Sequence, residues 1–219
     1  MFAGELISRN IPTLHLDDNA GKALQEMNDF HVCHLPVADE DKYLGLISED
    51  DLLDNDENVT IESLKGVFIA PFVLENDFFL LAVKRAKDFH LSVVPVITEQ
   101  YELLGAIGED DLFRQLAFFA GIDEQGGVII LEMEKNDFSA GELNRLIESN
   151  DAYITQLNSF FNTTSQLLTI TLRINKAEIS DIVATLQRHE YNIKYYYGEE
   201  LYQNELQNNF AHLMNYLNI

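Results

Sequence analysis

An internal repeat in the first half is the feature that most constrains the fold of this chain. Residues 11–54 align with residues 70–114 at an offset of 59 residues, which becomes 60 after one inserted residue. The matches keep their order, so chance explains them poorly, and such a repeat indicates a duplicated structural unit. The matched positions are Pro12 with Pro71, Asp18 with Asp77, Ala23 with Ala82, Asp29-Phe30-His31 with Asp88-Phe89-His90, Pro36-Val37 with Pro95-Val96, Leu44-Gly45 with Leu104-Gly105, Ile47 with Ile107, and Glu49–Leu52 with Glu109–Leu112.

Each unit has the pattern β-α-β-β-α. Apolar residues at helical spacing predict helices over 20–30 and 78–89, and Asp18 and Asp77 suit their N-caps. The strands are expected around Leu35–Val37 and Tyr43–Ile47 in the first unit, and around Val93–Ile97 and Leu103–Ile107 in the second. Neither unit can bury a full core alone, so we expect one two-lobed module over 1–122. The acidic stretch 54–60 is the expected linker.

The second half has a different order of elements. After Gly126-Gly127 the pattern predicts β-α-β-β-α-β, which is typical of a ferredoxin-like split unit. The expected strands are 128–134, 153–161, 167–174 and 193–197, and the expected helices are 140–148 and 177–189. A terminal helix with an apolar stripe is expected over 199–217. The fold class is therefore α/β (α+β) throughout.

Charge and cysteine content exclude several classes of protein. The 219 residues include 37 Asp and Glu against 14 Lys and Arg, for a net charge of -23. Phosphate backbones and anionic membrane surfaces would repel such a chain, so no nucleic acid or membrane partner is expected. Cys33 is the only cysteine, and we find no signal peptide or long apolar run, so we expect a cytoplasmic protein.

The two units carry a motif that resembles a known family. In the first, Leu35-Pro-Val37 precedes Gly45-Leu-Ile-Ser48-Glu-Asp-Asp51-Leu52, and in the second, Val94-Pro-Val96 precedes Gly105-Ala-Ile-Gly108-Glu-Asp-Asp111-Leu112. This ordered pair resembles the cystathionine-β-synthase (CBS) domain pair, or Bateman module. The second unit departs from the pattern, because Gly108 stands where Ser48 stands in the first.

The resemblance implies an adenosine-type ligand in clefts between the repeats. It assigns the first unit Thr13, Ser48 and Asp51, with the Asp carboxylate accepting from the ribose hydroxyls. Leu35 and Pro36 could give the base an apolar wall. The second unit supplies only Asp111, and Phe72 replaces the threonine, so its cleft is either empty or uses the ring for stacking. A structural alternative is that Asp51 and Asp111 only cap short helices.

The negative charges beside Asp51 favour a ligand that carries little negative charge of its own. Glu49 and Asp50 flank Asp51 with few cations nearby, so polyphosphates would meet repulsion. We therefore favour adenosine, or another weakly charged adenosine derivative such as S-adenosylmethionine, over ATP; AMP is also compatible with the resemblance.

The second half resembles an ACT-like domain. Its loop Asn136-Asp137-Phe-Ser-Ala-Gly141-Glu-Leu143 is similar to that family's Asp-x-Pro-Gly-x-Leu turn, with the proline absent and one extra residue. The resemblance implies that Asp137 and Gly141 contact an amino acid, whereas the alternative is ordinary helix capping by Asp137 or Ser139. The domain order also resembles the acetoin-utilisation regulatory proteins.

We find no motif that indicates catalysis. The acidic runs Glu49–Asp51 and Glu109–Asp111 could hold Mg²⁺ or Ca²⁺ through oxygen ligands, but a solvated face is the favoured interpretation. His31-Val-Cys33-His34 lacks the second cysteine pair of a zinc site, and His31 recurs as His90, which suggests a structural role at the helix end. We therefore predict a regulatory sensor and homodimer, with an unidentified regulated protein as partner; the alternative is a ligand-free interaction scaffold, and an enzyme is less favoured. The predicted divisions are a first CBS repeat (1–58), a second CBS repeat (59–122), an ACT-like domain (126–198) and a C-terminal helix (199–219).

Overall fold

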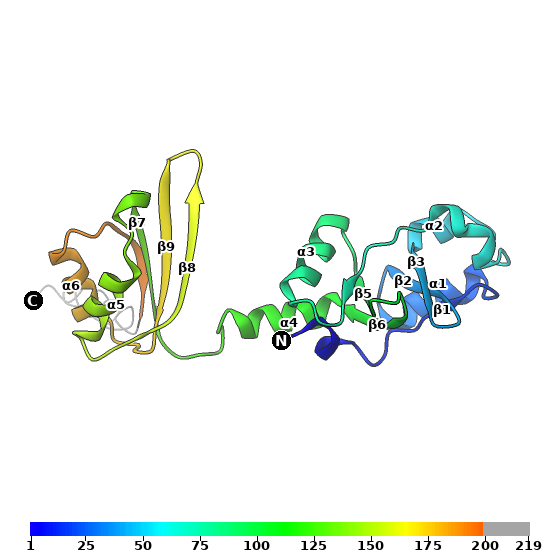
Figure 1. Cartoon of the computed structure of the whole chain (residues 1–219), viewed down its shortest axis with the longest axis horizontal. Coiled ribbons are helices and arrows are strands. Elements are labelled where there is room, and N and C mark those ends of the chain that lie inside the picture. The colour runs from blue at the N-terminus through cyan, green and yellow to red at the C-terminus, as the bar shows by residue number, and fades with distance from the viewer. Residues whose placement is uncertain (199–219) are drawn as a thin grey trace, which may run out of the picture. The chain divides into compact units, whose positions relative to one another are not determined.

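The chain is a mixed α/β protein with two compact units. A computed structural model describes residues 1–198, and the C-terminal helix predicted over 199–219 lies outside these residues. The first unit spans Met1–Phe119, and the second begins at Ala120 (Figure 1).

The first unit contains the two repeats, each with the predicted β-α-β-β-α order. In each, a parallel pair and an antiparallel pair of strands form a three-stranded sheet, β1-β2-β3 or β4-β5-β6. Val37 pairs with Gly45 and Val96 with Gly105, each just before a shift of register. The elements are β1 (Leu14–His15), α1 (Ala20–Phe30), β2 (His34–Asp39), β3 (Lys42–Ser48), α2 (Glu49–Leu53), β4 (Val73–Leu74), α3 (Leu80–Phe89), β5 (Val93–Ile97), β6 (Leu103–Gly108) and α4 (Glu109–Phe119).

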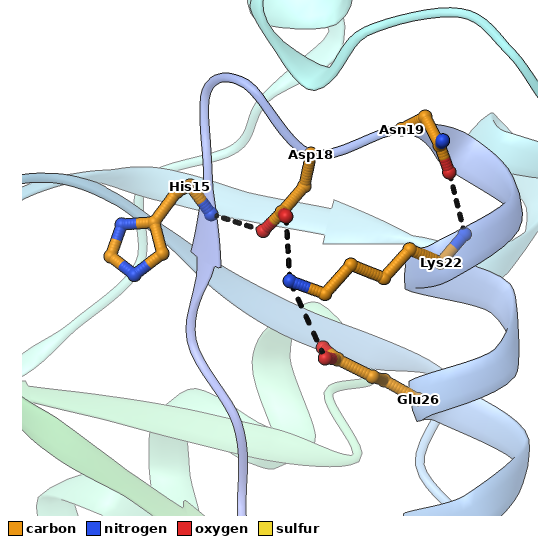
Figure 2. A network of polar contacts seen from close by, with 5 residues as sticks. All are labelled: His15, Asp18, Asn19, Lys22 and Glu26. Carbon is orange, nitrogen blue, oxygen red and sulfur yellow. Dashed lines mark hydrogen bonds and ion pairs between the residues drawn. The ribbon is translucent and has the colours of Figure 1, made fainter.

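The capping residues differ from those predicted. Asn19, not Asp18, caps α1, because its side chain accepts from the Lys22 amide at 2.8 Å (Figure 2). The Asp18 carboxylate instead accepts from the His15 amide at 2.9 Å and from Lys22 Nζ at 2.6 Å. Asp77 likewise accepts from the amide three residues before it, at 2.8 Å, and α3 has no side-chain cap. Both aspartates therefore close the turn before the helix and do not cap it.

The two histidines matched by the repeat end their helices. His31 and His90 are the C-cap residues of α1 and α3, with left-handed φ values of 54° and 55°. This is the structural role that the repeat suggests for the pair.

Two connecting segments pack against the repeat that is more distant in sequence. The 3₁₀ helix η1 (Ala3–Leu6) lies on the second repeat, where the Ala3 amide donates to Asp77 O at 2.8 Å. The segment that follows η2 (Ile61–Val67) lies on the first repeat, where the Leu46 amide donates to Ile69 O at 2.6 Å. These hydrogen bonds between the connecting segments and the opposite repeats hold the two repeats against each other.

The acidic stretch 54–60, predicted as a linker between the repeats, is hydrogen-bonded to the start of α1. The amides of Ala20 and Gly21 at the start of α1 donate to Val59 O and Glu57 O at 2.9 and 2.8 Å. The stretch therefore satisfies amides of the first helical turn, which would otherwise lack partners.

Each repeat has its own core, and the two cores are joined. Leu14, Leu35 and Ile47 belong to the core of the first repeat. Leu46, although it is on β3, belongs to the core of the second repeat and is fully buried.

Gly45 shows how closely a connecting segment approaches its sheet. Its φ is 155°, and a Cβ atom added there would lie 2.8 Å from Ile69 O and 2.9 Å from Phe68 Cβ. We therefore expect Gly45→Ala to lower the free energy of unfolding by about 1–3 kcal/mol. Urea denaturation measures this, with Gly66→Ala as control, because nothing lies within 4 Å of a Cβ at Gly66. Equal midpoints for the two variants would contradict the close approach.

The second unit has the predicted β-α-β-β-α-β order, with an antiparallel sheet of strand order β10-β7-β9-β8. This is the ferredoxin-like arrangement. Helices α5 and α6 lie together on one face of the sheet (Figure 1), and their apolar side chains form a single core with those of β7 and β9. The elements are β7 (Gly127–Met133), η3 (Lys135–Asp137), α5 (Ala140–Glu148), β8 (Ile154–Asn162), β9 (Leu167–Ile174), α6 (Ser180–Arg188) and β10 (Ile193–Tyr197). Helix α6 starts three residues later than predicted, after Ile179 with a φ of -120°.

Within residues 1–198, we find no helix with the length and apolar character needed to cross a bilayer.

Candidate ligand cleft

The first unit contains an open cleft of about 870 Å³ between its two repeats. This volume lies within the usual range of small-molecule sites, about 300–1,000 Å³. The first repeat contributes Phe30, His31 and Val32, and the second contributes Ser92 and residues at the start of α4. The N-terminal segment also lines it, so three parts of the chain meet there. The lining residues used below are Glu5, Ser8, Arg9, Ile11, Val32, Gly108, Glu109, Asp110, Asp111 and Arg114.

Asp111 is the best-connected acidic side chain in the cleft. Its Oδ2 accepts a hydrogen bond from the Ser8 hydroxyl, and its Oδ1 lies 2.7 Å from Arg114 Nη1. The Ser8 hydroxyl also accepts from the Gly108 amide at 3.0 Å. The carboxylate is about one-third exposed and is held from both sides, so it faces the cleft in a defined orientation.

Asp51, the equivalent residue in the first repeat, takes part in a capping box. The Ser48 side chain accepts from the Asp51 amide at 3.1 Å, and Asp51 Oδ2 accepts from the Ser48 amide at 3.3 Å. The structure therefore brings Ser48 and Asp51 together, in the helix-capping arrangement that the sequence left open. Capping does not prevent ligand binding, because a carboxylate has about four acceptor positions.

The apolar wall expected from Leu35 and Pro36 is not available in this conformation. Both are buried, and Leu35 lies in the core of the first repeat with no exposed surface. The reason is that both faces of β2 are covered, since its four consecutive residues Leu35–Ala38 are all buried. Ile11 and Val32 line the cleft instead.

Neither Thr13 nor Phe72 lines the cleft beside Asp111. Thr13 is half-buried just before β1, two residues beyond Ile11, a cleft residue. Phe72 makes edge-to-face contacts with Tyr43 and Tyr101, at ring-centroid distances of 6.4 and 5.6 Å. Its ring is therefore part of an aromatic cluster.

Charges of both signs line the cleft. Glu5, Glu109 and Asp110 join Asp111 on the acidic side, and Arg9 and Arg114 are the basic residues. The excess of acidic residues would repel a polyphosphate. The two guanidinium groups could still bind one phosphate or carboxylate group.

A polar contact joins the two repeats beside the cleft. The Ser92 hydroxyl accepts from the Cys33 amide at 2.9 Å, and the Ser92 amide donates to His34 Nδ1 at 3.3 Å. Burial lowers the pKa of His34, and the nearby Asp51 and Asp50 only partly oppose this. Protonation of Nδ1 would end the bond from the Ser92 amide and leave the Ser92 hydroxyl, at 3.2 Å, as the partner of Nδ1, which is consistent with the lowered pKa of His34.

His34 should therefore make stability depend on pH. A lowered folded-state pKa means that its contribution is complete above the unfolded value of about 6.5 and is lost as pH falls through the folded value. We expect the stability difference between wild type and His34→Gln to shrink from pH 7 to pH 5. Urea denaturation across that range measures this difference. His15→Gln is the control, because the His15 side chain is exposed. A constant difference would contradict this assignment.

In the second unit, the predicted loop residues are near the start of α5. Ser139 caps this helix, its side chain accepting from the Glu142 amide at 3.3 Å, and Asp137 belongs to η3. Asp137 and Gly141 are both exposed, and nothing lies within 4 Å of a Cβ added at Gly141. Packing within the unit therefore does not require this glycine.

Sequence reasoning missed Ser8 and Arg114. Ser8 reaches Asp111 from 103 residues away, and no local pattern indicates such a contact. Arg114 lies three residues after Asp111 on α4, a spacing that places two side chains on the same helix face and could have indicated the pair.

Comparison with known proteins shows that the first repeat is similar to a known domain family. Residues 3–58 match the family model of the CBS domain. The second repeat has the same order of elements, the same sheet topology and the matching strand register as this CBS repeat. The predicted resemblance to a CBS pair is confirmed by the family model for the first repeat and by the shared sheet topology for the second. The resemblance of the second unit to an ACT-like domain stays a prediction.

Several solved CBS structures are similar to about half of this chain. A CBS domain pair/ACT domain protein from Thermotoga maritima is 22% identical, with a TM-score of 0.49, covering 54% of this chain and 98% of that one. The CBS domains of a transcriptional regulator from Streptococcus pneumoniae are 18% identical, with a TM-score of 0.46 and coverages of 52% and 98%. A CBS domain protein from Pyrobaculum aerophilum, complexed with AMP, is 17% identical, with a TM-score of 0.45 and coverages of 54% and 99%.

Among the described residues 1–198, no group of three or more His, Cys, Asp or Glu side chains is arranged to hold a metal ion.

Proposed function

We propose that this chain is a regulatory protein that binds an adenosine-type ligand in the cleft beside Asp111. The observation that carries the proposal is the oriented Asp111 carboxylate on a cleft of about 870 Å³ lined by both repeats. Such a carboxylate suits the two hydroxyls of a ribose, because hydrogen bonds to an ionised acceptor are the strong ones. The resemblance of the motif to CBS pairs supports the same ligand class.

The rest of the ligand is matched by other residues of the cleft. Ile11 and Val32 offer apolar surface for a base, and Arg9 and Arg114 suit a single anionic group. We therefore propose adenosine, AMP or S-adenosylmethionine as the ligand, in preference to ATP.

The binding energy would act on the packing of the repeats. Residues from both repeats and from the N-terminal segment line the cleft, so a ligand that prefers one arrangement shifts their equilibrium. A partner protein would bind one arrangement of the repeats more tightly than the other, and so respond to the ligand. A homodimer is part of the proposal, and sedimentation against the mass of one chain would test it.

Thermal unfolding with a ligand panel tests the proposal. The panel contains adenosine, AMP, ADP and ATP, each with and without Mg²⁺, together with S-adenosylmethionine and the common amino acids. A ligand specific to the folded state, at one hundred times its Kd, should stabilise it by about 2.7 kcal/mol. Stabilisation by an adenosine compound supports the sensor, whereas no shift across the panel favours the ligand-free scaffold.

The amino acids in the panel also test the second unit. A contact between an amino acid and the exposed Asp137 and Gly141 is a prediction from the ACT-like resemblance. Stabilisation by one amino acid that Asp137→Ala abolishes would support it.

A further inference from the structure

The two repeats differ at one position of their shared motif. The first carries Ser48, whose hydroxyl bonds to Asp51 Oδ2 at 2.5 Å. The second carries Gly108, so its motif provides no hydroxyl for Asp111. The motif of the second repeat therefore lacks the hydroxyl that the first repeat uses to hold its aspartate.

The Ser8 hydroxyl lies beside the position that a side chain at 108 would take. A Cβ added at Gly108 would lie 3.6 Å from Ser8 Oγ and 3.8 Å from Asp111 Oδ2. Ser8 Oγ accepts from the Gly108 amide at 3.0 Å and donates to Asp111 Oδ2. It thus makes the bond to the aspartate that Ser48 makes in the first repeat.

The backbone around Ser8 is held against the second repeat. The Ser8 amide donates to Ala106 O at 2.9 Å, and the Gly4 amide donates to Glu75 O at 2.9 Å. Ile7 covers Gly105, where an added Cβ would lie 2.6 Å from Ile7 Cγ2. These contacts fix the position of the hydroxyl.

We propose that Ser8 is a positioning residue that replaces the missing motif serine of the second repeat, an inference that rests on the proposed function. A carboxylate has about four acceptor positions, and Ser8 and Arg114 use one on each oxygen of Asp111. Both oxygens therefore keep acceptor capacity for the two hydroxyls of a vicinal diol. Ser8 holds the carboxylate in the orientation that such a ligand needs.

The test is calorimetric titration of the full chain with adenosine. We expect Ser8→Ala to raise the Kd about tenfold, because the Asp111 carboxylate is then no longer held in the orientation that the two ribose hydroxyls need. Adding Gly108→Ser should return the Kd to within about threefold of wild type, because a side chain at 108 has room and its hydroxyl can reach Asp111. Ser8→Thr, which keeps the hydroxyl, should also stay within about threefold. A merely structural role for Ser8 would not be repaired by a hydroxyl placed at 108.

A second ligand tests whether the effect concerns the diol. 2′-Deoxyadenosine should bind wild type more weakly than adenosine does, and this difference should shrink in Ser8→Ala. If Ser8→Ala does not fold, the Ser8→Ala/Gly108→Ser variant decides: wild-type affinity supports the inference, and lost affinity contradicts it.

The inference and the proposed function fail in different ways. Wild-type affinity in Ser8→Ala, together with lost binding in Asp111→Asn, would overturn the role of Ser8 and leave the cleft as the site. No adenosine binding by the wild-type chain would overturn both.

Discussion

Asp111→Asn is expected to weaken adenosine binding by about 100-fold, the largest effect on affinity that this structure predicts. The carboxylate would accept hydrogen bonds from two ribose hydroxyls, and each bond to a charged acceptor contributes about 1.5–3 kcal/mol. A total of about 3 kcal/mol corresponds to roughly two orders of magnitude in Kd. The substitution keeps the shape of the side chain, so the cleft is retained while the charge is lost. Isothermal titration calorimetry measures the effect.

Asp51→Asn is the matched control, because Asp51 has the same position in the first repeat. Asp51 does not line the cleft beside Asp111, and its carboxylate takes part in the capping box with Ser48. We expect the Kd for adenosine to change by less than about threefold in this variant, with a modest loss of stability of about 0.5–2 kcal/mol from the weakened cap. Lost binding in Asp51→Asn with binding retained in Asp111→Asn would place the site where the motif alone first suggested it, in the first repeat.

Leu46→Ala is expected to lower the free energy of unfolding of the first unit by about 2–5 kcal/mol, the largest effect on stability among our predictions. Leu46 is fully buried, and its side chain packs in the core of the second repeat although it belongs to β3 of the first. Its truncation therefore removes packing that both repeats share. Because the connecting segments also cross between them, the repeats should unfold in a single transition.

Hydrogen exchange measured by mass spectrometry tests this coupling. Peptides from both repeats should lose the same free energy of protection in Leu46→Ala. The control is Leu53→Ala on α2, where the side chain is 63% exposed and truncation should change stability by less than about 0.5 kcal/mol. Loss of protection in one repeat alone would show that the two are not one cooperative unit.

Sequence patterns were sufficient for the architecture, because the relevant signals are local or repeated. Helical spacing and the ordered matches predicted both β-α-β-β-α units, and the β-α-β-β-α-β order predicted the ferredoxin-like unit. Helix starts were less predictable. Asp18 and Asn19 are adjacent and both suit an N-cap, and only the turn that Asp18 makes with His15 decides between them.

The candidate site was only partly predictable, because its parts are distant in sequence. The motif identified Asp111, but Gly108 and Phe72 made its cleft look incomplete. The missing hydroxyl comes from Ser8, and the apolar surface comes from Ile11 and Val32. The resemblance assigned Leu35 to an apolar wall for the base, yet Leu35 is buried, because the consecutive residues Leu35–Ala38 of β2 are covered on both faces of the sheet.

The stoichiometry of adenosine binding tests the central claim most directly. Calorimetric titration of the 219-residue chain should give one adenosine per chain, and Asp111→Asn should remove that binding over the same concentration range. Absence of binding by the wild-type chain, or unchanged binding by Asp111→Asn, would contradict the assignment of the Asp111 cleft as the ligand site.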